Sequence, residues 1–226
     1  MPATHGDLHG NVPENATIAL ILIDVINDLA FADGAMLLKH ALPMAKKLAA
    51  LKSRAKQCGI PSIYVNDNFG RWRSDFQTLI RHCLEEQVRG KPLATILQPD
   101  DDDYFVLKPK HSGFHSTTLE LLLQALGVRR LILTGIAGNI CVLFTANDAY
   151  MRDYALVIPA DCVASNTVAE NKSALQLMQK VLKADIRPST ELDLAALAHT
   201  GRARPDIPGK PKAPSSNRVP FLGRSA

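Results

Sequence analysis

A cysteine stands where a buried strand gives way to a helix. Cys141 follows the apolar run 131–133 and a small-residue turn around Gly135, and a helix is expected from Ile140 onward. Backbone N–H groups in the first turn of a helix lack partners within the helix, and the helix dipole places partial positive charge there. This environment favours the thiolate, so we expect Cys141 to be a nucleophile at neutral pH. The alternative is a small apolar side chain packed beneath the helix, the default role of a lone cysteine.

Two further reactive side chains stand at the ends of predicted strands. Asp24 follows the apolar run 18–23, whose unbroken hydrophobicity is typical of a strand buried on both faces of a parallel sheet. Lys108 follows the short predicted strand 104–107. In open α/β sheets, ligands bind at the edge formed by the carboxyl ends of the strands. We therefore expect Asp24 to take the proton of the Cys141 thiol there, while Lys108 holds Asp24 and the developing negative charge in place.

Strand-like and helix-like segments alternate along most of the chain. Strands are predicted at 18–23, 61–65, 104–107, 130–134 and 155–158, with a final edge strand at Ile186 and Arg187. Helices are predicted at 43–58, 74–89, 115–126, from 140, at 168–183 and at 191–198. Such alternation favours right-handed crossovers and a parallel sheet between helical layers. The predicted fold class is α/β: a three-layer α/β/α Rossmann-like sandwich with a mostly parallel six-stranded sheet.

The three reactive side chains lie in three distinct motifs. The first is 19–24 followed by Asn27 and Asp28, the second is 106–114, and the third is 134–142 with the small and polar residues 145–149 behind it. In order and spacing these motifs resemble the cysteine hydrolases of the isochorismatase-like superfamily, which includes nicotinamidases, carbamoylsarcosine amidohydrolases and ureidoacrylate amidohydrolases. The resemblance covers roughly residues 16–190.

The resemblance implies both a site and a reaction. It implies an Asp24-Lys108-Cys141 triad, a non-proline cis peptide bond between Ile136 and Ala137, and an oxyanion hole made by the backbone amides of Ala137 and Cys141. Losing one donor of such a hole typically costs about 100- to 1000-fold in rate. Our leading hypothesis is hydrolysis of a non-peptide C–N bond in a small amide, carbamoyl or ureide compound through a thioester at Cys141. Asp24 would deprotonate the thiol, protonate the leaving amine and then activate water, and Lys108 would keep Asp24 ionised.

Two loops and the turn before the nucleophile supply candidate substrate contacts. These candidates are Asn68, Phe69, Trp72, His111, Phe114 and Ile136. Residues 66–68 are alternatively ordinary turn formers, and Trp72 is alternatively a contact between subunits. His111 beside a thiol also allows a Cys-His pair, which we rank below the triad because Asp24 already supplies a base.

Three positions bear on the polarity of the site. Many family members carry polar residues where this chain has Gly138 and Ile26. We therefore expect more freedom in the turn, a pocket that is wider or less rigid than usual, and a less polar pocket floor. Metal-dependent nicotinamidases place an aspartate with nearby histidines after the second strand, whereas the first histidine after Asp67 is His82. Zinc prefers nitrogen and sulfur ligands, so we expect no metal at Asp67 and no cofactor.

The composition is that of a single enzyme domain. The chain has 226 residues, 46% of them hydrophobic, and a formal net charge of +4. We predict an N-terminal extension (1–15), a hydrolase domain (16–200) and a flexible basic tail rich in Pro, Gly and Ser (201–226). The tail nearly lacks aromatic residues, which argues against nucleic-acid binding. Without a long apolar run or a signal peptide, we expect a cytoplasmic protein with a small-molecule substrate and no membrane partner.

The four cysteines form no Cys-x-x-Cys pair, and in a chain of this length they indicate no dense framework of disulfides. The resemblance further implies a homodimer or homotetramer.

Three other functions compete with C–N hydrolysis. One is vinyl-ether hydrolysis of isochorismate, which needs no thiol nucleophile, so that Cys141 points away from it. Another is a non-catalytic binding or redox-sensing protein on the same fold, with Cys141 as the oxidised group. A dinucleotide-binding enzyme is the least favoured, because Gly135 and Gly138 do not form Gly-x-Gly-x-x-Gly.

Overall fold

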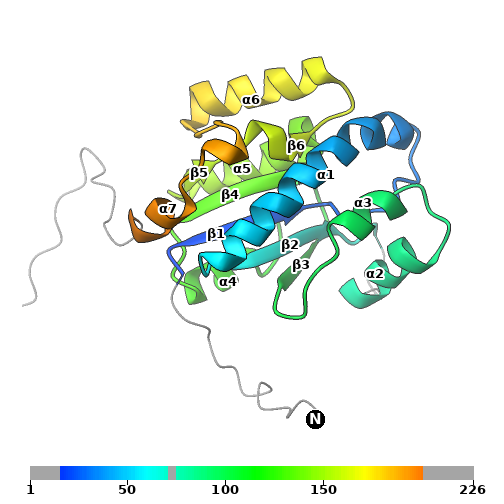
Figure 1. The fold of residues 1–226 in the computed structure, drawn as a ribbon, viewed down its shortest axis with the longest axis horizontal. Helices are drawn as coiled ribbons and strands as arrows, with labels where there is room; N and C mark the ends of the chain where they lie inside the picture. Colours follow the sequence, from blue (N-terminus) through cyan, green and yellow to red (C-terminus); the bar gives the residue numbers. More distant parts are fainter. Residues whose placement is uncertain (1–15, 71–74, 201–226) are drawn as a thin grey trace, which may run out of the picture.

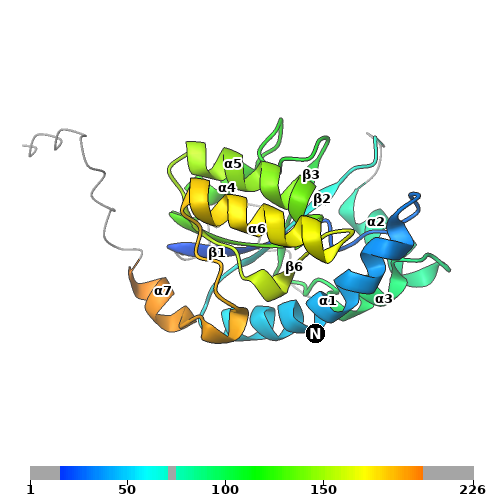
Figure 2. The same cartoon turned by 90° about the horizontal axis from the view of Figure 1, so that it is seen from above.

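Six parallel strands form one sheet with helices on both faces (Figures 1 and 2). The computed structural model describes residues 16–70 and 75–200. The sheet order is β3-β2-β1-β4-β5, and β6 also pairs with β4. The strands are β1 (Ile18–Ile23), β2 (Ser62–Asp67), β3 (Tyr104–Lys108), β4 (Arg130–Ile136), β5 (Ala155–Val157) and β6 (Val163–Ala164). The predicted α/β/α architecture is confirmed.

Each face of the sheet has its own helical layer (Figure 2). One layer holds α1 (Gly34–Gln57), α2 (Phe76–Glu85), α3 (Lys91–Ile96) and α7 (Leu194–Thr200). The other holds α4 (Leu119–Ala125), α5 (Leu143–Met151) and α6 (Val168–Leu182). Between β4 and α5 the chain forms the short π-helical turn η2 (Gly138–Val142). The 3-10 turns η3 (Ala160–Cys162) and η4 (Ser189–Glu191) complete the regular structure of the described residues.

The central strand β1 is buried along its whole length, as its unbroken apolar run predicts. Leu20 and Leu22 pack into the core beneath α1, while Ile21 and Ile23 pack into the core beneath α4 to α6. Full burial of one such side chain contributes about 1.5–3 kcal/mol to folding. Strand β1 therefore supplies the rigid centre from which the first reactive side chain emerges.

Helix α1 begins at Gly34 rather than at Pro43, so the predicted start is wrong. The prediction relied on the frequency of proline at the first position of helices. Here Pro43 lies inside α1 on an exposed face. The carbonyl that loses its helical hydrogen bond is that of Lys39, also exposed, so water can satisfy it.

Two further differences concern short elements. Residues 186–187 form no strand; instead Asp185 makes an isolated parallel bridge with Val157, and the sixth strand is β6. Helix α3 is also absent from the predicted elements. Elements of two to six residues carry too little hydrophobic periodicity to be recognised from the sequence.

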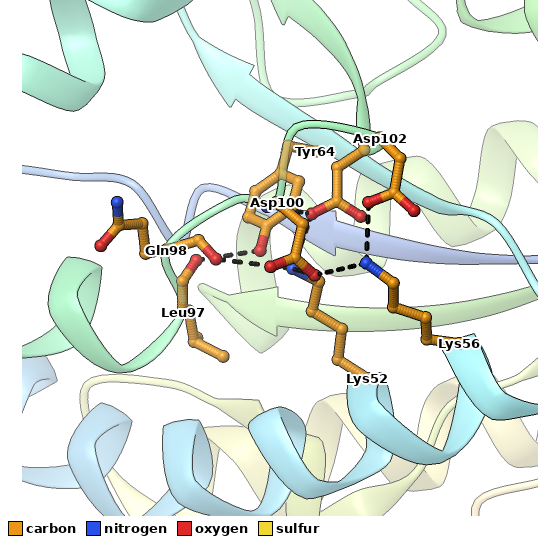
Figure 3. A network of polar contacts seen from close by, with 8 residues as sticks. Lys52, Lys56, Tyr64, Leu97, Gln98, Asp100 and Asp102 are labelled. Carbon is orange, nitrogen blue, oxygen red and sulfur yellow. Dashed lines mark hydrogen bonds and ion pairs between the residues drawn. The ribbon is translucent and has the colours of Figure 1, made fainter. Parts of the chain in front are cut away.

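A charged network ties α1 to the loop that leads into β3 (Figure 3). Lys52 lies 2.6 Å from Asp103 and 3.3 Å from Asp100, while Lys56 lies 2.8 Å from Asp102. Beside this network the Tyr64 hydroxyl donates to the carbonyl of Leu97 at 2.9 Å. These contacts fix the start of β3, the strand that ends in Lys108.

Some features of the sequence lie beyond these ranges. The predicted extension (1–15), the predicted tail (201–226) and Trp72 lie outside the described residues. Within the described ranges, none of the helices combines the length and the apolar character needed to cross a bilayer.

Candidate active site

The structure brings the three predicted triad side chains into contact. Asp24 follows β1, Lys108 is the last residue of β3, and Cys141 lies in η2 after β4. The Lys108 ammonium nitrogen is 2.8 Å from Asp24 Oδ2 and donates to Cys141 Sγ at 3.6 Å. Parallel strands bring these side chains to one edge of the sheet because all their carboxyl ends point the same way.

Asp24 is held on both carboxylate oxygens. Oδ2 pairs with Lys108, and Oδ1 accepts a hydrogen bond from the backbone N–H of Asp67 at 2.7 Å. The backbone of Asp24 has φ 53°, a left-handed conformation that aspartate tolerates better than most residues. Its own N–H donates to the carbonyl of Val65 at 3.0 Å, so the turn stays joined to β2. The carboxylate is thereby fixed in position before any substrate binds.

Lys108 is fully buried, and three polar groups surround its ammonium. Besides Asp24 and the thiol, the carboxylate of Asp67 lies 3.6 Å away. The sequence analysis considered Asp67 as a metal ligand, a substrate contact or a turn former and missed this role. The available signal was its place at the carboxyl end of β2, beside the strand end that carries Asp24.

Burial and charge set the protonation of the site. Burial raises the pKa of the Asp24 carboxyl, and the ammonium of Lys108 opposes that rise without cancelling it. Burial acts to lower the pKa of Lys108, but Asp24 and Cys141 outweigh it and the pKa rises. Burial and the nearby Asp24 together raise the pKa of the Cys141 thiol to about 12, against the influence of Lys108. The resting cysteine is therefore a thiol beside a charged lysine.

This state corrects the expectation of a resting thiolate at Cys141. Cys141 does lie in the first helical turn after β4, but burial of the sulfur and the adjacent carboxylate raise the pKa of its thiol. Attack by the sulfur therefore requires transfer of its proton as the substrate is engaged. Asp24, whose raised pKa makes it the better base, is placed to receive that proton.

The turn before the nucleophile contains the non-proline cis peptide bond that the resemblance implies, between Ile136 and Ala137. The carbonyl of Ala137 accepts from the N–H groups of Ile140 at 3.0 Å and Val142 at 3.2 Å. Ala137 and Cys141, the two residues predicted to form the oxyanion hole, thus belong to one hydrogen-bonded turn.

Gly138 is tightly packed, so the prediction that it adds freedom to the turn is wrong. A Cβ atom on Gly138 would stand 2.5 Å from Asn171 Oδ1, 2.6 Å from Val163 Cγ1 and 2.9 Å from Ser165 Oγ. The Ser165 hydroxyl also accepts from the N–H of Asn139 at 3.2 Å. The absence of a side chain lets β6 and α6 approach the turn, and rigidity comes from that close approach.

Replacing Gly138 with alanine is expected to destabilise the fold by about 1–3 kcal/mol, the usual cost of overpacking a filled site. Urea unfolding measures the change. Gly59→Ala is the reference: Gly59 has φ +67°, and a methyl group there would meet no atom within 4 Å. That variant therefore reports the cost of backbone conformation alone, about 1 kcal/mol. Equal stability of Gly138→Ala and the unsubstituted protein would contradict the packing argument.

The loop after β2 is a series of side-chain-capped turns. Asp67 Oδ1 accepts from the N–H of Phe69 at 2.6 Å, and Asn68 Oδ1 accepts from the N–H of Gly70 at 2.9 Å. Asn68 and Phe69 also line a cavity of about 240 Å³, together with Phe31, Leu107 and residues of α2. The loop thus has the turn-forming role that its composition indicates, and two of its residues face a cavity as well.

The remaining candidate contacts separate into one exposed residue and two core residues. His111 is exposed, and its Nδ1 lies 3.9 Å from Cys141 Sγ. Phe114 is 5% exposed and packs against Tyr154 and Arg152. Ile136 is 1% exposed and belongs to the core beneath α1. The positions of Phe114 and Ile136 favour structural roles over substrate contact.

Ile26 also lies in the core, fully buried, and its carbonyl accepts a hydrogen bond from the Asn66 amide at 2.7 Å. Its side chain therefore packs in the core beneath the turn after β1. The expectation of a less polar pocket floor had instead placed this side chain at the pocket surface.

The groups considered for metal binding have other partners. Asp67 contacts Lys108, and His82 lies 3.2 Å from Asp28 and 2.9 Å from Glu86. Among the described residues, Asp100, Asp102 and Asp103 do gather closely enough to share an ion. They carry the ion pairs with Lys52 and Lys56 that anchor the start of β3, away from the strand ends that carry the triad.

Comparisons with known proteins agree with this geometry. A family model described as "Isochorismatase domain" matches residues 18–186. An uncharacterized isochorismatase family protein of Bacillus subtilis, YaaI, is 46% identical over 174 residues, which cover 77% of this chain and 95% of that protein. The ureidoacrylate amidohydrolase RutB of Methylorubrum extorquens is 44% identical over 69 residues, 30% of this chain and 28% of that protein.

Among solved structures, the N-carbamoylsarcosine amidase of Thermoplasma acidophilum has the same fold. It aligns with a TM-score of 0.60 and 24% identity, covering 78% of this chain and 99% of that protein.

Proposed function

Because the chain belongs to the isochorismatase family, we propose that it is a cysteine-dependent hydrolase of a C–N bond in a small amide, carbamoyl or ureide compound. One observation carries the proposal: a single buried ammonium, that of Lys108, contacts both the Asp24 carboxylate and the Cys141 sulfur. A nucleophile, a base and a group that orients both are the minimal parts of thiol catalysis.

The reaction begins with the thiol proton. Asp24 accepts it as Cys141 Sγ attacks the carbonyl carbon of the substrate, and the charged Lys108 stabilises the negative charge that develops on sulfur. Backbone amides of the turn that holds Ala137 and Cys141 then stabilise the oxyanion of the tetrahedral intermediate. Loss of the amine leaves a thioester on Cys141, which water hydrolyses.

A cavity lies beside the loop after β2, next to the end of β3, and none of the described residues that line it belongs to the triad. Its volume of about 240 Å³ lies just below the range of ligand pockets, which begins at about 300 Å³, so only a small molecule would fit. Its lining combines the apolar side chains of Phe31, Phe69 and Leu107 with the polar groups of Asn68 and His82. Such a mixture suits a compact molecule with a few hydrogen-bonding groups.

Release of ammonia from a panel of small amides, carbamoyl compounds and ureides tests the proposal. We expect release from at least one class, together with loss of that release in Cys141→Ala. Isochorismate is run in parallel with detection of the vinyl-ether cleavage products. Turnover of isochorismate that survives in Cys141→Ala would replace the proposal with thiol-independent vinyl-ether hydrolysis.

A further inference from the structure

His111 lies beside the nucleophile, within 4 Å of its sulfur. Its Nδ1 lies 3.9 Å from Cys141 Sγ, whereas the Lys108 ammonium lies 3.6 Å from the same sulfur. Lys108 is fully buried, but His111 is exposed. The sulfur is therefore bordered by a fixed cation on its inner side and by an imidazole on its solvent side.

The loop that carries His111 is anchored to the nucleophile's own helix. Thr145 of α5 donates from its hydroxyl to the carbonyl of Cys141 at 2.7 Å, and the same hydroxyl accepts from the N–H of Gly113 at 3.0 Å. Ser112 hydrogen-bonds to Asp148, also in α5. The ring of His111 packs against Phe144, with ring centroids 5.5 Å apart. The loop is thus fixed against α5, and the contact with Phe144 holds the imidazole beside the sulfur.

Asp24 is the buried proton acceptor for the sulfur. Its two oxygens are engaged by Lys108 and the N–H of Asp67, and only 4% of the residue is exposed. The leaving nitrogen and the incoming water need an acid and a base that can reach them from solvent. Imidazole is the side chain whose charge changes nearest neutral pH, so it can fill both roles.

We propose that His111 is a second proton-transfer residue of this site: it gives a proton to the leaving nitrogen and regains one from the hydrolytic water. This inference rests on the proposed C–N hydrolysis and assigns the proton transfers of that reaction to two residues. Asp24 handles the proton of sulfur, and His111 handles the protons of nitrogen and water.

The proton balance closes over one cycle. In acylation the thiol proton passes to Asp24, the S–C bond forms, the C–N bond breaks, and its electron pair takes a proton from Nδ1 of charged His111. Neutral His111 then accepts a proton from water as the water oxygen attacks the thioester carbonyl. The C–S bond breaks and Asp24 returns its proton to sulfur. One water is consumed, and both residues regain their starting states.

The test compares an amide with an ester whose leaving group needs no proton. In His111→Asn the amide can keep a polar atom near the position of Nδ1 but does not titrate. We expect this variant to lose about 100- to 10,000-fold in kcat/KM for the amide found in the panel. With p-nitrophenyl acetate the burst of p-nitrophenolate, which reports acylation, should stay within about threefold, while the steady-state rate falls at least about tenfold.

His115→Asn is the matched control, because His115 is exposed in the same loop and its ring has no contact with Cys141 among the described residues. It should behave as the unsubstituted protein. In His111→Gly, added imidazole should restore part of the lost amide hydrolysis, since the site is open to solvent.

Amide hydrolysis by His111→Asn within about threefold of the unsubstituted protein would overturn the proposal. So would an equal loss in the ester burst, since that result assigns His111 to orienting the thiol. If no amide is turned over, the proposed function fails separately, and the deacylation rate with p-nitrophenyl acetate still decides whether His111 activates water.

Discussion

Cys141→Ala is expected to lower C–N bond hydrolysis by at least about 10⁴-fold while leaving the fold intact, because no other cysteine among the described residues contacts Lys108. The sulfur is small, and its neighbours Lys108 and Asp24 hold each other through their own 2.8 Å contact. Removal of the sulfur therefore leaves the ion pair in place. Ammonia release and circular dichroism measure the two parts of this expectation.

The matched control for this variant is Cys58→Ala. Cys58 is exposed at the end of α1 and has no place in the site. It should retain full activity but remove one site of alkylation. Turnover by Cys141→Ala at the rate of the unsubstituted protein would rule out the covalent mechanism.

Lys108→Met is expected to destabilise the protein by about 3–5 kcal/mol at neutral pH and to abolish measurable turnover. The reason is that Asp24 would be left as a buried charge without its partner. Methionine fills a similar volume, so the loss reports charge rather than a cavity. Urea unfolding at several pH values gives the stability.

The sign of the pH dependence follows from the pKa of Asp24. Burial already raises that pKa in the folded protein above the ordinary value, and removal of Lys108 raises it further. A carboxyl whose pKa is higher in the folded state binds protons more tightly there, so lowering the pH favours folding at this site. The destabilisation of Lys108→Met should therefore shrink as the pH falls toward that raised pKa.

The double variant Asp24→Asn with Lys108→Met separates charge from packing. Removing both charges should recover much of the stability that Lys108→Met loses, because replacing a buried ion pair with neutral groups is often close to neutral. Strict additivity of the two single effects would contradict a coupled pair at this edge of the sheet.

The positions of Asp24, Lys108 and Cys141 could be inferred from the sequence for a physical reason. Each follows an apolar strand, and parallel strands present their carboxyl ends at one edge, so strand ends fix the approximate place of the side chains. The protonation of Cys141 could not be inferred, because burial of the sulfur depends on packing that only the folded chain shows.

Side chains in loops and turns were harder to place than strand ends. Phe114 and Ile136 lie close to triad residues in the sequence, yet their side chains point into the cores on the two faces of the sheet. Gly138 suggested freedom, but its neighbours in β6 and α6 come from segments much further along the chain, at Val163 and Asn171. Contacts between residues so far apart in the sequence leave no pattern in the residues next to Gly138.

The sheet order has a consequence for how activity arises during folding. Strand β1 pairs with β4, so that Ile18 lies opposite Arg130. Strands β2 and β1 lie between β3, which ends in Lys108, and β4, which leads to Cys141. Pairings between such distant segments form slowly, because closing the long loop between them costs conformational entropy before any stabilising contact forms. The contact of Cys141 with Lys108 therefore forms only when the two halves of the sheet have joined.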